Sequence, residues 1–177
     1  MLRRMIPLSC ACVCACVCAC VCLITPRVAS AAVPSEREVR GAIRMFLENP
    51  TSSSITYARR TIITFADESD AVTVTISKKA VPWSAQEGLE HGEALLCAFI
   101  AGNVLSQLDS GVNADDPYSG LLKVFRVYRG IKKRRKRYNV PTIEGLLDMH
   151  RRGRLMRYLL PVEKEEGKDE GGRMKDE

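Results

Sequence analysis

The sequence has few of the residues from which enzymes usually build active sites. It contains two histidines, His91 and His150, one tryptophan, and only 6% aromatic residues. A histidine-rich metal site or a serine, histidine and aspartate triad therefore has little material. The motifs HExxH, GxSxG and CxxC are absent, and so is a glycine loop that could cradle a phosphate. These absences lower the expectation of an enzyme without excluding one, and we predict no metal and no cofactor.

Cysteine is nearly absent from the part of the chain that is expected to fold. Seven of the eight cysteines lie in one run between residues 10 and 22, which leaves Cys97 alone downstream. A single cysteine cannot form an internal disulfide, so the fold has to be held together by its apolar core. Cys97 falls in an apolar segment, where cysteine usually packs as a small hydrophobic residue.

The N-terminal segment lacks acidic residues and predicts export. A short arginine-containing start precedes residues 5–25, which carry no charge, and the small residues Ala29 and Ala31 follow. This order is typical of a secretory signal with an A-x-A cleavage site. We therefore predict a signal peptide over residues 1–31 and a secreted or periplasmic location. An uncleaved membrane anchor, or lipidation at Cys20, stays open as an alternative, and each leaves the domain outside the cytoplasm.

The rest of the chain is long enough for one domain. Of the 177 residues, 46% are hydrophobic and 27% are charged, which is typical of a globular protein. We predict a single helical domain over residues 32–160. Residues 161–177 hold seven acidic and four basic residues with no sizeable apolar cluster, so we predict a disordered acidic tail.

Apolar residues spaced three and four apart predict a mainly α fold of about five helices, in a bundle or a short helix-hairpin array. Ser35 and Glu38 form a capping box that begins the first helix, and Pro50 ends it. Asp116 and the proline after it predict the start of another. The predicted helices are centred near residues 40, 60, 97, 124 and 149.

The most apolar segment, residues 87–108, predicts a central helix, because its apolar residues spread around more than one face. Small residues within it, among them Gly102, would let neighbouring helices come close.

Residues 71–77 follow a different pattern and predict one short extended segment. Val72, Val74 and Ile76 alternate with threonines, as in a strand with one buried face. No other segment alternates as convincingly. The segment would therefore pair with residues 55–65, pair across a dimer, or lie extended over the helices.

The strongest feature downstream of the predicted signal is a basic cluster. Residues 123–157 contain thirteen basic and two acidic residues, a net charge of +11. Charge at this density attracts partners rich in phosphate or carboxylate, and cations at a helix C-terminus are favoured by the helix dipole. The predicted binding residues are Lys132, Lys133, Arg134, Arg135, Lys136, Arg137, Arg151 and Arg152.

These observations predict a non-catalytic binding or interaction domain. For an exported protein the expected partners are anionic lipid headgroups or acidic polysaccharide, and a protein partner is also open. Nucleic acid becomes the leading partner only if the N-terminal segment is not a signal. The simplest alternative is a solvated, charged helix end that has no partner.

A carboxylate-dependent secreted enzyme is the main functional alternative. Its candidate residues are the carboxylates Glu87, Glu90 and Asp116. Of these, Glu87 would share one face of the predicted central helix with His91. A cleft that gathers these acids with His91 or Tyr118 would support it.

The loop over residues 109–116 resembles a calcium-binding loop. Calcium loops need an oxygen ligand at the third position and a glutamate at the twelfth. Here these positions are Gly111 and Gly120. We therefore favour a connector between two helices, with Asp116 as the cap of the second.

Overall fold

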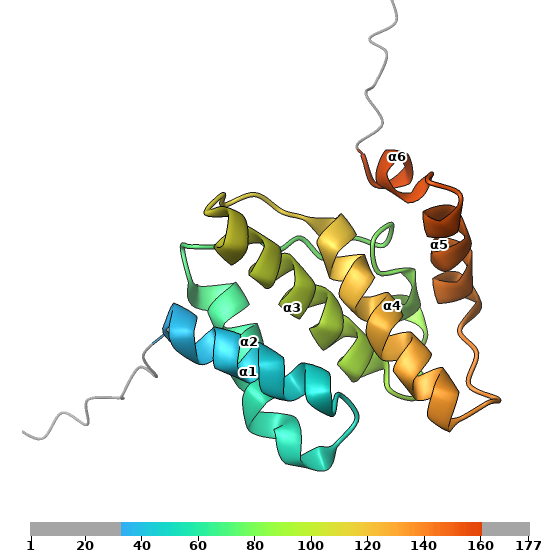
Figure 1. Ribbon diagram of the computed structural model, residues 1–177, viewed down its shortest axis with the longest axis horizontal. Helices are drawn as coiled ribbons and strands as arrows, with labels where there is room; N and C mark the ends of the chain where they lie inside the picture. The colour runs from blue at the N-terminus through green and yellow to red at the C-terminus, as the bar shows by residue number, and fades with distance from the viewer. Residues whose placement is uncertain (1–32, 161–177) are drawn as a thin grey trace, which may run out of the picture. The chain divides into compact units, whose positions relative to one another are not determined.

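The computed structural model describes residues 33–160, and within this range it contains six α-helices and no strand (Figure 1). The prediction of a mainly helical fold is confirmed. The predicted signal peptide with its cleavage residues Ala29 and Ala31, and the predicted acidic tail, lie outside the described residues. The helices are α1 (Glu36–Glu48), α2 (Thr56–Glu68), α3 (Gly92–Ser110), α4 (Pro117–Arg134), α5 (Pro141–Arg151) and α6 (Leu155–Leu159), with short 3₁₀ turns η1 (Ser53–Ile55) and η2 (Pro82–Ala85).

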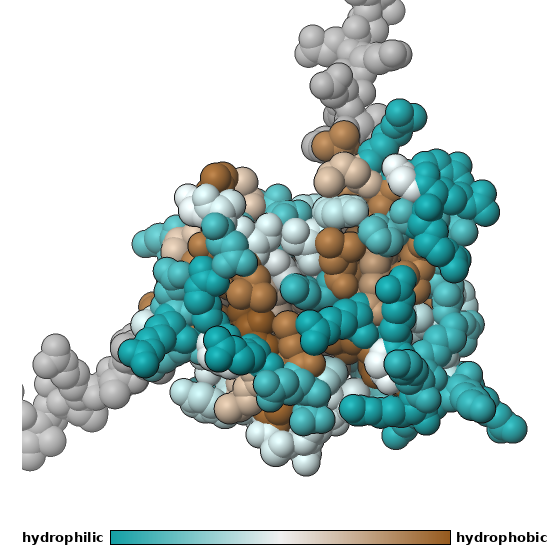
Figure 2. Space-filling view, in the orientation of Figure 1, coloured by the Kyte–Doolittle hydropathy of each residue, from teal (hydrophilic) through white to brown (hydrophobic). Residues whose placement is uncertain are grey.

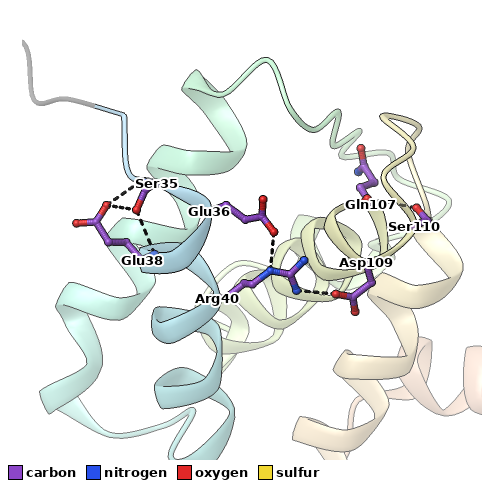
Figure 3. Close-up of polar contacts among 7 residues, drawn as sticks. All are labelled: Ser35, Glu36, Glu38, Arg40, Gln107, Asp109 and Ser110. Carbon is purple, nitrogen blue, oxygen red and sulfur yellow. Dashed lines mark hydrogen bonds and ion pairs between the residues drawn. The ribbon is translucent and has the colours of Figure 1, made fainter.

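The start of α1 is fixed by the capping box that the sequence predicts. The Ser35 hydroxyl accepts a hydrogen bond from the backbone N–H of Glu38, and the Glu38 carboxylate accepts one from the N–H of Ser35 (Figure 3). Arg40, one turn further on, donates to Glu36 at 2.8 Å and to Asp109 at 2.5 Å. This arginine joins the start of α1 to the C-terminal end of α3.

The most apolar helix, α3, is also the central one. The hairpin of α1 and α2 packs on one side of it and α4 on the other, while α5 and α6 lie beyond α4 (Figure 1). Burial of residues on more than one face explains why α3 lacks a polar stripe. The largest fully buried side chains of the core include Phe46, Ile62, Trp83, Leu95, Phe99, Leu121 and Tyr128.

Two glycines allow α3 and α4 to cross closely. A Cβ atom on Gly102 would lie 2.5 Å from the carbonyl oxygen of Ser119, and a Cβ on Gly120 would lie 2.8 Å from the Phe99 ring. Real Cβ contacts are not this short, so neither position has room for a side chain. The prediction that small residues of the central helix admit a close neighbour is confirmed at Gly102.

The predicted start of the central helix at residue 87 is wrong. Residues 87–91 form turns, and α3 begins at Gly92. Gly88 has φ +68° and His91 has φ 61°, both in the left-handed region that interrupts a helix. Glu87 and His91 consequently do not share a helix face.

The segment over residues 71–77 crosses the C-terminal half of α3 without a partner strand in the described part of the chain. Val72 is buried and Val74 is half-buried, but Ile76 is 48% exposed. The backbone of Thr73 donates to the side-chain oxygen of Gln107 at 2.8 Å and accepts from its side-chain nitrogen at 2.7 Å. The Gln107 amide thus supplies the two hydrogen bonds that a neighbouring strand would have made.

A buried polar network extends from this contact. Asn103 and Gln107, on successive turns of α3, are 0% and 3% exposed. Gln107 donates to the Asn103 side-chain oxygen at 2.6 Å, and that oxygen also accepts from the N–H of Asp116 at 3.0 Å. Asn103 donates to the Asp115 carboxylate, which in turn accepts from the backbone of Thr75. The network fixes two irregular segments against α3.

Candidate anion-binding surface

The predicted basic residues 132–137 occupy the last turn of α4 and the turn that follows it. α4 ends at Arg134, and Arg135 is its C-cap residue. Lys133 and all four residues from Arg134 to Arg137 are exposed, while Lys132 is half-buried. The hydrophilic side chains that gather around the C-terminal end of α4 are visible in Figure 2. Cations at this end of the helix are favoured by its dipole.

Two of these cations are engaged in contacts between distant segments. Lys132 forms an ion pair with Glu144 of α5, and its Nζ lies 5.5 Å from the centre of the Tyr128 ring. The Tyr128 hydroxyl donates to the same carboxylate at 2.7 Å. The hydrogen bond from Lys132, and to a smaller extent the one from Tyr128, lowers the pKa of Glu144. Arg135 pairs with Glu90, in the turn just before α3.

The structure does not bring Arg151 and Arg152 into the same cluster. Both lie at the C-terminal end of α5, which begins just after the basic turn and runs away from it over about 16 Å. Each also pairs with Asp148, at 3.5 and 2.7 Å. Of the eight predicted residues, Lys133, Arg134, Lys136 and Arg137 have no acidic partner among residues 33–160.

Two further arginines extend the basic surface along α4. Arg126 and Arg129 line an open groove of about 730 Å³ together with Leu122, Gly130, Lys132 and Lys133. The positions 122, 126, 129 and 133 follow helical spacing, so they form one stripe on the outer face of α4. We call Arg126, Arg129 and Lys133 the α4 stripe. The same spacing is present in the sequence, but the denser run after residue 131 dominates the charge pattern there.

The members of the α4 stripe are all exposed and form no ion pair with any other described residue. Gly130 leaves a gap between their side chains, and Leu122 places an exposed apolar group at one end. Along the helix axis the three cations span about 10 Å. A row of unpaired cations gives this face of α4 a positive potential.

The carboxylates proposed for an enzyme do not converge. Glu87 is exposed in a turn, and Glu90 contacts Arg135 near the N-terminal end of α3. Asp116 lies beside the C-terminal half of that helix, where it accepts from Ser106 at 2.5 Å and caps α4 through the N–H of Ser119. The part of α3 from Gly92 to Ser106 separates the two positions, which corresponds to about 20 Å.

Asp116 is held in its ionised form by its role as a cap. Burial raises the pKa of Asp116, but hydrogen bonds from Ser106, from Ser119 and from the Tyr118 backbone outweigh this and leave the pKa below its ordinary value. Its acceptor capacity is therefore already used, as the connector interpretation of the loop predicts. Within residues 33–160, no group of three or more histidine, cysteine, aspartate or glutamate side chains has the arrangement of a metal site.

The remaining candidates also have structural roles. The Nδ1 atom of His150 lies 3.4 Å from the hydroxyl oxygen of Tyr118, and the His150 ring packs beside the Phe125 ring. Cys97 is 1% exposed, and burial raises the pKa of its thiol to about 12. A thiol with that pKa stays protonated near neutral pH and is a poor nucleophile.

Comparison with models of protein families, with curated proteins and with solved structures finds no match for this chain. Over the described range, none of the helices combines the length and apolar character needed to cross a membrane.

Proposed function

We propose that this protein is a non-catalytic binding module whose contact surface is the α4 stripe together with the exposed turn after α4. The observation that carries the proposal is the row of three unpaired cations on one face of α4. The stripe needs no rearrangement to meet repeated negative charges. The proposal replaces Arg151 and Arg152 of the sequence-based set with Arg126 and Arg129, because the latter form no ion pair within the described part of the chain, whereas both of the former pair with Asp148.

The partner that fits this surface carries closely spaced phosphate, sulfate or carboxylate groups. If residues 1–31 direct export, as their sequence predicts, the available partners are anionic lipid headgroups and acidic polysaccharide. Both present many charged groups, and each group contributes only a weak ionic contact. Binding is therefore expected to depend strongly on salt.

The test is binding of the purified protein to vesicles that contain an anionic phospholipid and, separately, to a sulfated polysaccharide. The variant R126Q/R129Q/K133Q removes the α4 stripe. At about 1 kcal/mol for each cation close to an anionic surface, the triple variant should bind about a hundredfold more weakly at low salt.

The matched control is R37Q/K78Q/R157Q, which removes the same charge from single exposed positions on α1, in the loop before η2 and on α6. Its binding should change less than about twofold. Equal losses in the two triple variants would show that net charge alone drives binding. Binding of the unaltered protein that is insensitive to salt, or no binding to either partner, would refute the proposal.

A further inference from the structure

A second surface, separate from the α4 stripe, has the character of a ligand site. A groove of about 500 Å³ lies between α2 and the N-terminal half of α3. This volume falls within the range of about 300 to 1,000 Å³ that small-molecule sites occupy. Its walls are mostly hydrocarbon, from Ile63 of α2 and from Leu96 and Ile100 of α3, and Cys97 also lines it. Ile63 is 48% exposed, so an apolar side chain is left open to water at the groove.

The rim of this groove is positively charged. Arg59 and Arg60 border it from α2, with Glu93 on the opposite side. Arg60 is exposed and has no acidic partner among the residues described. Arg59 donates to the carbonyl of Ser52 at 3.2 Å and to Glu93 at 3.4 Å, but its Nε is buried without a hydrogen-bond partner. The Glu93 side chain is 92% exposed, so this ion pair is loose and water-screened.

The lining of the groove favours a small molecule over a docked protein segment. Its residues on α2 run from Thr56 to Thr64, about 12 Å along the axis, or little more than two turns. A helix seated in a groove presents apolar anchors at i, i+3, i+4 and i+7, whereas the aliphatic part of this wall is confined to three side chains. The wall offers hydrocarbon along its length and cations only at its edge, which is the pattern that an amphiphile with one acidic end complements.

We propose that this groove binds a free fatty acid of medium chain length. Its hydrocarbon tail lies against Ile63, Leu96 and Ile100, and its carboxylate accepts hydrogen bonds from the guanidinium groups of Arg59 and Arg60. Transfer of the tail from water to the apolar wall supplies the affinity, and the arginines select an acid over an alcohol or a cation. The protonated Cys97 thiol adds no charge to the wall against which the tail rests.

The experiment is calorimetric titration of the full-length protein with decanoate, decanol and decyltrimethylammonium, each below the concentration at which it aggregates. Decanoate should bind saturably with one site per chain and about tenfold more tightly than decanol. The cation should bind least well. Saturable binding that is equal for decanoate and decanol would overturn the proposal, as would absence of decanoate binding.

Two variants, each with a matched control, test whether decanoate binds in this groove. Ile63→Ser removes the exposed apolar wall, and Ile76→Ser removes an isoleucine of the same 48% exposure outside the groove. Arg60→Gln removes a rim cation, and Arg157→Gln removes an exposed cation of α6. Ile63→Ser should weaken decanoate binding about tenfold and Arg60→Gln about fivefold, with less than about twofold change in the two controls.

All four positions are exposed, so the variants should fold, and circular dichroism verifies it. Unchanged decanoate binding by Ile63→Ser, or equal losses in Ile63→Ser and Ile76→Ser, would overturn the proposed location. The R126Q/R129Q/K133Q variant should keep full affinity for decanoate. The fatty-acid site and the anion-binding surface therefore succeed or fail in separate measurements.

Discussion

Replacement of Gln107 by glutamate should destabilise the protein in a manner that depends on pH. The variant keeps the size and shape of the side chain but loses the two hydrogen bonds that the Gln107 nitrogen donates to Thr73 and Asn103. At about 1 to 1.5 kcal/mol for each bond, and with a charge placed at a site only 3% exposed, the loss at pH 7 should be on the order of 3 kcal/mol.

The pH dependence follows from the cost of the buried charge. The folded state disfavours the ionised form of the carboxyl group that Gln107→Glu introduces, so the pKa of this group in the folded protein should rise above the unfolded value of about 4.3. The full penalty applies above the folded pKa, and it should shrink as pH falls toward the unfolded value, because the folded state then takes up a proton. Urea denaturation followed by circular dichroism at pH 7 and pH 5 measures both effects.

Gln86→Glu is the matched control, because Gln86 is exposed at the end of η2 and the substitution makes the same change of charge. It corrects for the pH dependence of the rest of the protein and should itself alter stability by less than about 0.5 kcal/mol. A Gln107→Glu protein as stable as this control at pH 7 would refute the assignment of Gln107 as the partner of the 71–77 segment.

Gly120→Ala should destabilise the protein by about 1 to 3 kcal/mol in thermal or urea denaturation, because the added methyl group meets the Phe99 ring at the crossing of α3 and α4. Gly145→Ala on α5, with nothing within 4 Å, should stabilise by about 0.5 to 1 kcal/mol, and equal effects at the two glycines would contradict the crossing. Glu144→Gln should flatten the acid side of the stability profile. The lowered pKa of Glu144, caused first by Lys132, gives stability that is present above the ordinary value of 4.5 and is lost as pH falls through the folded pKa. An unchanged profile would show that the pair with Lys132 does not persist in solution.

Several local features of the fold were predictable because their causes lie within a few residues. The capping box of Ser35 and Glu38 closes over three positions, and the Asp116 cap joins its own first turn. Helical spacing identified α1, α2, α4 and α5, and the apolar character of α3 indicated its central place. In each case the hydrogen bonds or the buried face belong to one continuous segment.

The start of α3 shows where local reasoning stopped. Apolar spacing continued back to residue 87, but the chain turns at Gly88 and His91 before the helix begins. Tyr138, far along the chain, donates from its hydroxyl to the carbonyl of Glu90, and His91 packs on its ring. A contact between residues 48 positions apart in the chain thus helps to hold the turn before α3. Helical periodicity in the sequence gives no indication of such a contact.

The helical class of the domain, its main caps and its dense basic region follow from composition and from spacing along the chain. Which of the cations remain unpaired depends instead on how the helices pack. Lys132 and Arg135 meet Glu144 and Glu90 through packing of distant segments, whereas the α4 stripe forms no ion pair with an acidic side chain in the range described. Availability of a charge depends on its neighbours in space, and those neighbours are set by how the helices pack.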